Sequence, residues 1–146
     1  MTTKVEIAKS KFIEGFNCAQ SVLYSFCDDL NFDKEIALKL ACGFGAGMGR
    51  KEEVCGAVTG GIIAIGIKFG RNNANDKVSG EMTYKKTREL MDNFGKQNGT
   101  YICRKLLNDC ELTTEEGHKK FNELNLRNTV CLKCVQNAVE LLEPML

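Results

Sequence analysis

The sequence predicts an all-α fold, a single-domain bundle of about six to eight helices around a central apolar, Gly-rich helix. Apolar residues recur at intervals of three and four along most of the chain, and no segment alternates with the period of two that a strand needs. Residues that favour helix N-caps precede these segments, and the one proline stands near the end, at position 144. A chain of 146 residues is long enough for one domain, residues 1–146, with its own core.

Three helices are expected before a glycine-rich loop. Residues 4–15 form the first, and Gly15 ends it. Asn17 is placed to cap the second helix, and Asp33 is placed to cap the third. The expected inward face of the third helix carries Ile36, Leu40 and Ala41.

The fourth expected helix is the segment that begins at Cys55 and runs to about Phe69. It is apolar nearly all round, which is typical of a central helix surrounded by others. Residues 70–76 have the composition of a loop. A fifth helix follows from about Lys77 and ends at Gly99.

The last third of the chain offers caps for three further helices. Thr100 is placed to cap a short helix, and Thr113 with Glu116 has the spacing of a capping box. Thr129 is placed to cap the last helix, which stops near Pro144.

Glycine occupies positions 43, 45, 47 and 49 just before the Cys55 segment. Alternating glycine is unfavourable in a helix or strand, so a tight loop is predicted there. Its backbone N–H groups, with Arg50 beside them, form a candidate anion or cofactor site, and the candidate residues are Gly45, Gly47, Gly49, Arg50 and Gly56. The alternative, which the sequence favours, is a tight connection that packs closely on a neighbouring helix.

Glu52 and Glu53 follow the loop and are expected at the N-terminus of the next helix, where acidic side chains are stabilised. The net charge of +1 gives no reason to expect a nucleic acid or membrane partner. No apolar stretch of a secretory signal is visible near the N-terminus, and residues 54–67 are too few for a membrane span. A cytoplasmic location is therefore expected, where cysteine-rich chains are more often catalytic, redox-sensing or metal-binding than disulfide scaffolds.

The chain has eight cysteines, and four of them fall at expected helix starts, where a thiol pKa is lowered. These candidate catalytic residues are Cys18, Cys55, Cys103 and Cys131, with Cys55 the strongest. The sequence does not determine the roles of the other four, and it favours inert, buried positions for three of them, Cys27, Cys42 and Cys110. Cys134 makes a C-x-x-C with Cys131, and either a redox pair or an inert buried thiol fits it equally well.

Several blocks of the chain resemble the C_GCAxxG_C_C family, whose members are described as putative redox-active proteins. The central motif corresponds to Cys55-Gly56-Ala57-Val58-Thr59-Gly60. Residues 15–20 are similar to the block around the first family cysteine, and residues 45–50 are similar to the Gly-rich lead-in. Residues 103–107 and Cys131 are similar to the last two cysteine blocks. The resemblance implies a redox role and, because members are often encoded near transporter genes, a functional link to a membrane transporter.

Three functional hypotheses remain open from the sequence. In the first, the protein cycles between dithiol and disulfide, with Cys55 paired to Cys18, Cys103 or Cys131 and an unidentified redox partner. In the second, these four thiolates bind a metal ion or an iron–sulfur cluster. In the third, the cysteines are inert parts of a scaffold or adaptor. The first two require the four cysteines to gather at one end of the bundle, with at least one pair close enough to bridge.

Overall fold

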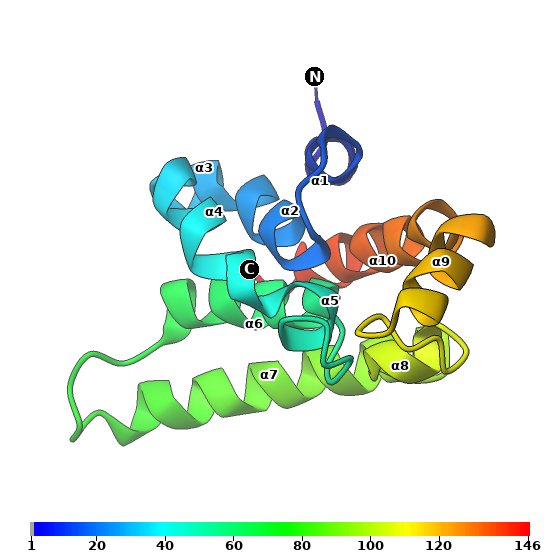
Figure 1. Cartoon of the computed structure of the whole chain (residues 1–146). Coiled ribbons are helices and arrows are strands. Elements are labelled where there is room, and N and C mark those ends of the chain that lie inside the picture. Colours follow the sequence, from blue (N-terminus) through cyan, green and yellow to red (C-terminus); the bar gives the residue numbers. More distant parts are fainter. Residues whose placement is uncertain (1) are drawn as a thin grey trace.

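Helices build almost the whole molecule, as Figure 1 shows. The computed structural model describes residues 2–146, and within this range there is no strand. The nearest approach to one is an isolated antiparallel bridge between Val54 and Ile102. The predicted all-α fold class is confirmed.

The helices of eight or more residues that lie within residues 2–146 are α1 (Lys4–Glu14), α2 (Cys18–Ser25), α4 (Lys34–Ala41), α6 (Gly56–Phe69), α7 (Lys77–Asn98), α9 (Glu115–Glu123) and α10 (Leu132–Leu142). Shorter helical segments connect them, and these are α3 (Cys27–Leu30), η1 (Cys42–Phe44), α5 (Gly45–Met48), α8 (Cys103–Leu106) and the π-helical turn η2 (Arg127–Cys131). Seven longer helices therefore carry the fold, within the expected six to eight.

Helix α6 lies in the middle of this arrangement and packs against α2, α7 and α10 (Figure 1). Its first six residues, 56–61, are all buried. Gly60 lets α2 come close, because a Cβ atom there would lie 2.5 Å from the carbonyl oxygen of Ala19. Gly61 does the same for α7 and α10, because its Cβ would meet Leu90 and Leu142. The central Gly-rich helix of the prediction is therefore present, and its glycines are contact points.

Two of the predicted caps are present at the first helices. The Asn17 side chain accepts a hydrogen bond from the N–H of Gln20, and the Gln20 side chain accepts one from the N–H of Asn17. The Asp33 carboxylate accepts from the N–H of Ile36 at the start of α4. These caps fix where α2 and α4 begin.

Three other predicted caps are wrong. Thr100 does not cap α8, whose N-cap residue is Ile102, and the Thr100 hydroxyl instead accepts a hydrogen bond from the N–H of Ile102 before the helix begins. Helix α9 is capped by Thr114 rather than Thr113, since the Thr114 hydroxyl accepts from the N–H of Gly117. Thr129 caps no helix, because it lies inside η2 and its hydroxyl donates to the carbonyl of Asn125. The chain runs without a break from η2 into α10, so Cys131 is not at a free helix start.

The prediction of which α4 residues face the core is also wrong in part. Ile36 and Leu40 are 56% and 48% exposed, whereas Ala37 and Ala41 are fully buried. Helix α4 packs on α2 through these small side chains, which allow a close approach, and its larger aliphatic residues lie on the outer side.

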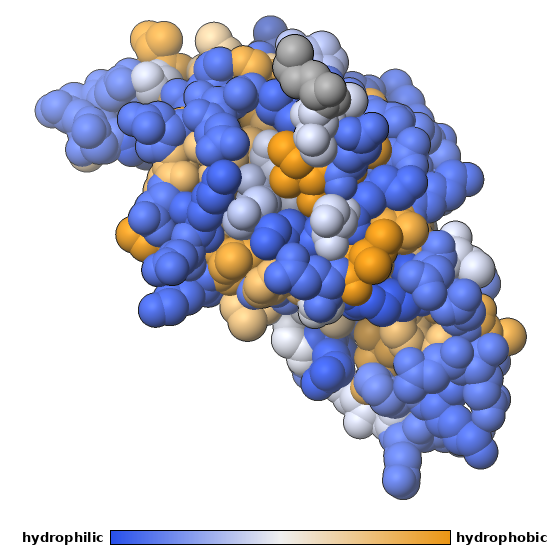
Figure 2. All heavy atoms as spheres, turned by 90° about the horizontal axis from the view of Figure 1, so that it is seen from above, coloured by the Kyte–Doolittle hydropathy of each residue, from blue (hydrophilic) through white to orange (hydrophobic). Residues whose placement is uncertain are grey.

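The molecular surface seen from above is mostly polar, with separate small apolar patches (Figure 2). Within residues 2–146, none of the helices combines the length and the hydrophobicity that crossing a bilayer requires.

Candidate functional site

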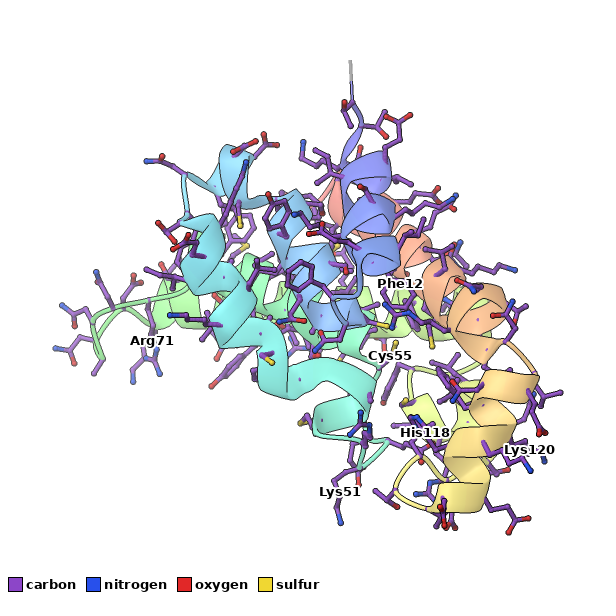
Figure 3. All side chains as sticks on the ribbon, turned by 45° about the horizontal axis from the view of Figure 1, so that its top comes forward. Phe12, Lys51, Cys55, Arg71, His118 and Lys120 are labelled. Carbon is purple, nitrogen blue, oxygen red and sulfur yellow. The ribbon has the colours of Figure 1, made fainter. Side chains whose placement is uncertain are left out.

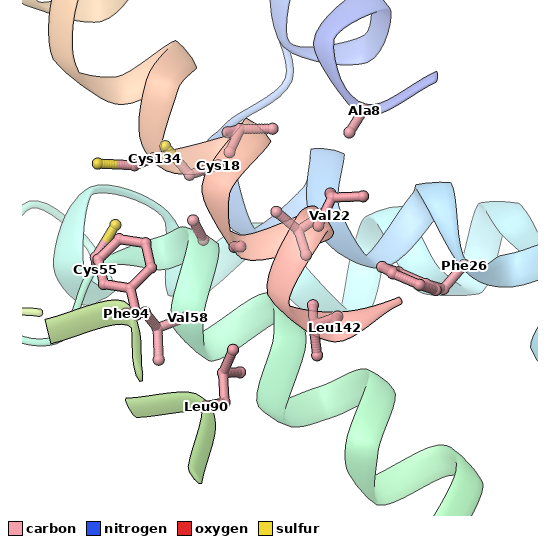
Figure 4. Close-up of a cluster of buried hydrophobic side chains, with 14 of the residues drawn as sticks. Ala8, Cys18, Val22, Phe26, Cys55, Val58, Leu90, Phe94, Cys134 and Leu142 are labelled. Atoms are coloured by element: carbon pink, nitrogen blue, oxygen red, sulfur yellow. The ribbon is translucent and has the colours of Figure 1, made fainter. Parts of the chain in front are cut away.

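Five cysteines from five different parts of the chain line one small cavity of about 90 Å³. They are Cys18 in α2, Cys55 just before α6, Cys103 in α8, Cys131 in η2 and Cys134 in α10. Figure 4 shows three of them, Cys18, Cys55 and Cys134, at one end of the buried core. The four cysteines expected to gather therefore do so, and Cys134 joins them.

Cys55 is the N-cap residue of α6, and backbone hydrogen bonds tie it to the chain before α8. Its N–H donates to the carbonyl of Tyr101 at 2.8 Å, and the N–H of Cys103 donates to the carbonyl of Glu53 at 2.7 Å. Because these two bonds flank the bridge between Val54 and Ile102, they hold the starts of α6 and α8 side by side. Cys55 and Cys103 consequently face the same cavity.

Cys18 reaches the cavity because the starts of α2 and α6 touch. A Cβ atom on Gly56 would lie 3.2 Å from both the Cys18 Cβ and the Ala19 nitrogen. Only a residue without a side chain allows this contact without displacement. The glycine that follows Cys55 in the motif thus sets the approach of the Cys18 helix.

Cys131 and Cys134 project from the same side of the η2–α10 segment, since residues three apart are neighbours on a helix. Arg127, one turn earlier, anchors this segment by donating hydrogen bonds to the carbonyls of Phe12 and Phe16. Its guanidinium also lies 3.8 Å from the ring centre of Phe12. The segment is thereby fixed against the end of α1.

The surroundings of Cys55 favour its thiolate. The neighbouring Cys134 thiol is the largest influence and lowers the pKa of Cys55, and the backbone N–H groups of Ala57 and Val58 lower it further. Burial acts in the opposite direction without reversing the net shift. The pKa of Cys134 is raised, first by its interaction with Cys55 and then by burial. Within this pair, the negative charge is therefore favoured on Cys55 and the proton on Cys134.

The other two shifts in the cavity are opposite to the expectation from helix starts. The pKa of Cys18 is raised, first by its interaction with Cys131 and then by burial. Burial raises the pKa of Cys103, and the negative charge of Cys55 adds to it. Helix α8 has only four residues, so its dipole is small against the cost of burying a charge. Cys18 and Cys103 are thus held as neutral thiols next to Cys55.

The glycine-rich loop packs tightly at two of the candidate anion-binding positions. A Cβ on Gly45 would lie 2.3 Å from the Asn17 side chain, and one on Gly47 would lie 2.5 Å from the Glu52 Cα. Gly49 has nothing near its Cβ position, and Arg50 is exposed. Gly45 and Gly47 therefore allow the loop to pack closely against neighbouring residues, and the accessible side of the loop is at Gly49 and Arg50.

Neither Glu52 nor Glu53 lies in the first turn of a helix, because α6 begins only at Gly56 and has no acidic residue there. Glu53 is exposed, whereas Glu52 points inward. The Glu52 carboxylate is buried, accepts a hydrogen bond from the N–H of Leu112 at 2.8 Å and lies 3.5 Å from the Arg104 guanidinium. The expectation for Glu52 was wrong because the loop turns it inward, where it ties the loop to α8 and the segment after it.

Three cysteines lie outside the cavity. Cys27 is buried in the cluster between α2, α4 and α6, and burial raises its pKa to about 11. Cys110 is buried, and its thiol donates to the carbonyl of Gly117. Cys42 is exposed, contrary to the expectation, because η1 begins there and turns its side chain out of the α4 packing.

Cys134 is the site residue that sequence reasoning left open. Its C-x-x-C spacing with Cys131 was the available signal. That spacing pointed to Cys131 as its partner, whereas the fold places the Cys134 thiol against Cys55 and pairs Cys131 with Cys18. The partner comes from another helix, so the local pattern alone does not reveal it.

A metal ion at this site would need several of the thiols to surround one point. Thiolates suit soft metals such as zinc or iron. Across residues 2–146, however, no three or more His, Cys, Asp and Glu side chains are arranged so that they could hold one ion.

The motif and the cavity can be compared with known proteins. The sequence model of one family, described as "Putative redox-active protein (C_GCAxxG_C_C)", matches residues 16–145. The chain belongs to the C_GCAxxG_C_C family. Neither a curated protein nor a solved structure gives a significant match to it. In this C_GCAxxG_C_C protein, the cysteines that resembled the family pattern are the ones that share the cavity with Cys134.

Proposed function

We propose that the protein is a thiol–disulfide redox protein in which Cys55 is the nucleophile and Cys134 is the resolving thiol. One observation carries the proposal: the sulfur favoured as a thiolate stands at the N-terminus of α6 in contact with a second thiol from α10. A thiolate beside a protonated thiol is the starting state for dithiol–disulfide exchange. Membership of a family described as redox-active supports the same chemistry.

The reaction follows from this starting state. The Cys55 thiolate attacks one sulfur of a substrate disulfide, which forms a mixed disulfide and releases the other substrate sulfur as a thiolate. Cys134 then gives up its proton, attacks the Cys55 sulfur and releases the second substrate thiol. Two electrons pass from the protein to the substrate, the protein retains a Cys55–Cys134 disulfide, and an external dithiol must reduce it again.

A second pair of thiols stands next to the first. Cys18 and Cys131 interact directly, and Cys131 is the most exposed of the five cavity cysteines. Since disulfides migrate between neighbouring thiols by exchange, this pair offers a route by which an external reductant reaches a disulfide formed at Cys55. The sequence suggested Cys18, Cys103 or Cys131 as the partner of Cys55. In this proposal the partner is Cys134 instead, and Cys18 and Cys131 form the second redox pair.

The test is to map disulfides after limited oxidation. Reduced protein, purified without oxygen, is treated with a small excess of bis(2-hydroxyethyl) disulfide, digested without reduction and analysed by mass spectrometry. We expect the Cys55–Cys134 cross-link to form first. Cys55→Ser should abolish it, whereas the matched control Cys27→Ser, at a buried thiol outside the cavity, should leave it intact.

Two outcomes would overturn the proposal. One is that no cavity cysteine forms a disulfide while the protein remains folded, which favours an inert scaffold. The other is that the anaerobic protein contains a stoichiometric metal that Cys55→Ser removes, which favours the metal or iron–sulfur alternative with Cys18, Cys55, Cys103 and Cys131 as ligands.

A further inference from the structure

A surface cleft with a volume of about 580 Å³ opens beside the cysteine cavity. It lies between the glycine-rich loop and α9, and its size is typical of small-molecule sites. Three of its lining residues are basic, Arg50, His118 and Arg127, and none of the residues that line it is Asp or Glu. The cleft therefore presents positive charge without an internal counter-charge.

The two arginines keep their charge available. Within residues 2–146, neither Arg50 nor Arg127 has a carboxylate within ion-pair distance. Arg127 donates to two backbone carbonyls, which hold it in place but do not neutralise it. Arg50 is exposed at the end of a loop whose backbone is fixed by packing. A fixed cation facing an open cleft attracts anions.

The cleft differs in charge from a neighbouring hollow that shares Arg50 and His118 with it. This hollow is larger and includes Glu115 and Glu116, so its charge is mixed. The cleft itself shares residues with the cysteine cavity, among them Ala46, Leu112 and Arg127. A molecule bound in the cleft is therefore adjacent to the thiols.

We propose that this cleft binds anionic low-molecular-weight disulfides, whose carboxylates pair with Arg50 and Arg127 while the S–S bond faces the cysteine cavity. The inference rests on the proposed function, because it names the substrate class of the same thiols. The bound disulfide RSSR accepts two electrons: Cys55 forms the mixed disulfide as RS⁻ leaves, and Cys134 closes the protein disulfide as RSH leaves. The products are two molecules of the anionic thiol.

The experiment compares three disulfides that differ in charge. Glutathione disulfide carries carboxylates, bis(2-hydroxyethyl) disulfide is neutral and cystamine is cationic, and the rate of protein disulfide formation is followed by mass. The variant is Arg50→Gln. The matched control is Lys51→Gln, which removes the same charge from the next residue of the same loop, where the side chain points away from the body of the protein (Figure 3) and does not line the cleft.

Arg50→Gln should slow oxidation by glutathione disulfide about fivefold relative to oxidation by the neutral disulfide. Lys51→Gln should change neither rate by more than about twofold, since its charge is exposed and screened. The inference is overturned if the two variants have the same rates with all three disulfides. It is also overturned if Arg50→Gln does not raise the rate with cystamine relative to the rate with glutathione disulfide.

A binding measurement separates this inference from the proposed function. S-methylglutathione has the two carboxylates of one half of glutathione disulfide and no disulfide bond to reduce, so calorimetry with this probe reports on the cleft alone. Binding that is weakened by Arg50→Gln but not by Lys51→Gln supports the cleft even if no protein disulfide ever forms. Normal oxidation of Cys55 by the neutral disulfide, without any binding of S-methylglutathione, rejects the cleft and leaves the thiol chemistry in place.

Discussion

Gly60 offers a sharp test of how the fold brings the sulfurs together. It lies where α6 crosses α2, and its missing side chain leaves room for the backbone of Ala19, the residue after Cys18. In Gly60→Ala the new Cβ would lie 2.5 Å from the Ala19 oxygen and 2.9 Å from its Cα. Both are backbone atoms, so no flexible side chain can move aside to relieve the overlap.

The size of the effect follows from these distances. An ordinary contact begins at 3.4 Å, so the start of α2 must move by roughly 1 Å from α6. Overpacking of this kind costs about 3 kcal/mol, and the better helix propensity of alanine returns about 1 kcal/mol. We expect Gly60→Ala to lower the free energy of unfolding by about 2 kcal/mol. Because Cys18 moves with α2, its contact with Cys131 should loosen as well.

Gly66→Ala is the matched control, since Gly66 lies in the same helix and has nothing within 4 Å of its Cβ position. There the gain in helix propensity should raise the free energy of unfolding by about 1 kcal/mol. Urea unfolding followed by circular dichroism measures both variants, and a difference of about 3 kcal/mol is expected. The yield of the Cys18–Cys131 disulfide after limited oxidation should fall only in Gly60→Ala.

A Gly60→Ala variant as stable as Gly66→Ala would show that α2 and α6 do not need the close approach at Gly60. A second outcome is that Gly60→Ala is destabilised as expected but forms the Cys18–Cys131 disulfide at the normal rate. In that case the close approach of α2 and α6 would matter for stability without positioning the sulfurs.

Three further predictions concern ionisable groups. Cys134→Ala removes the thiol that lowers the pKa of Cys55, so the pH profile of Cys55 alkylation by iodoacetamide should move to higher pH, and an unchanged profile would contradict the pairing. The pKa of Cys27 is raised from 9.0 to about 11 in the folded protein, so its contribution to stability is present below pH 9.0 and is lost as the pH rises to about 11. Between these pH values, Cys27→Ser should therefore lose less stability in urea unfolding than the unchanged protein does. An equal loss in the two proteins would count against the shift. Glu52→Ala leaves the buried N–H of Leu112 without a partner and removes one of the two carboxylates beside Arg104, which keeps Glu111, so it should lower the free energy of unfolding by about 2 kcal/mol. Glu53→Ala, at an exposed carboxylate, should change the free energy of unfolding by less than about 0.5 kcal/mol, and equal effects of the two variants in urea unfolding would contradict the buried role of Glu52.

Local patterns in the sequence were sufficient to locate the longer helices, although not every helix start. The side chains of Asn17 and Asp33 each accept a hydrogen bond from the backbone N–H three residues later. Both partners of each bond lie within one short segment, so the local sequence is enough to predict these caps. Thr129 shows the limit of the same reasoning. A threonine before an apolar stripe is typical of a helix cap, but η2 continues into α10 without a break. Arg127 fixes the turn before Thr129 by hydrogen bonds to carbonyls more than a hundred residues away, and a local pattern does not include these contacts.

The sequence by itself determined the all-α fold, the tight glycine-rich turn, the central helix α6 and the family pattern of cysteines. These depend on periodicity, backbone freedom and motif order, which are local properties. Only the tertiary structure decided that Cys134 lies against Cys55, that Cys18 and Cys103 are held protonated and that Glu52 is buried. The physical reason is that the pKa and the partner of a thiol depend on burial and on neighbouring sulfurs from other helices, and these neighbours are set by how the helices pack.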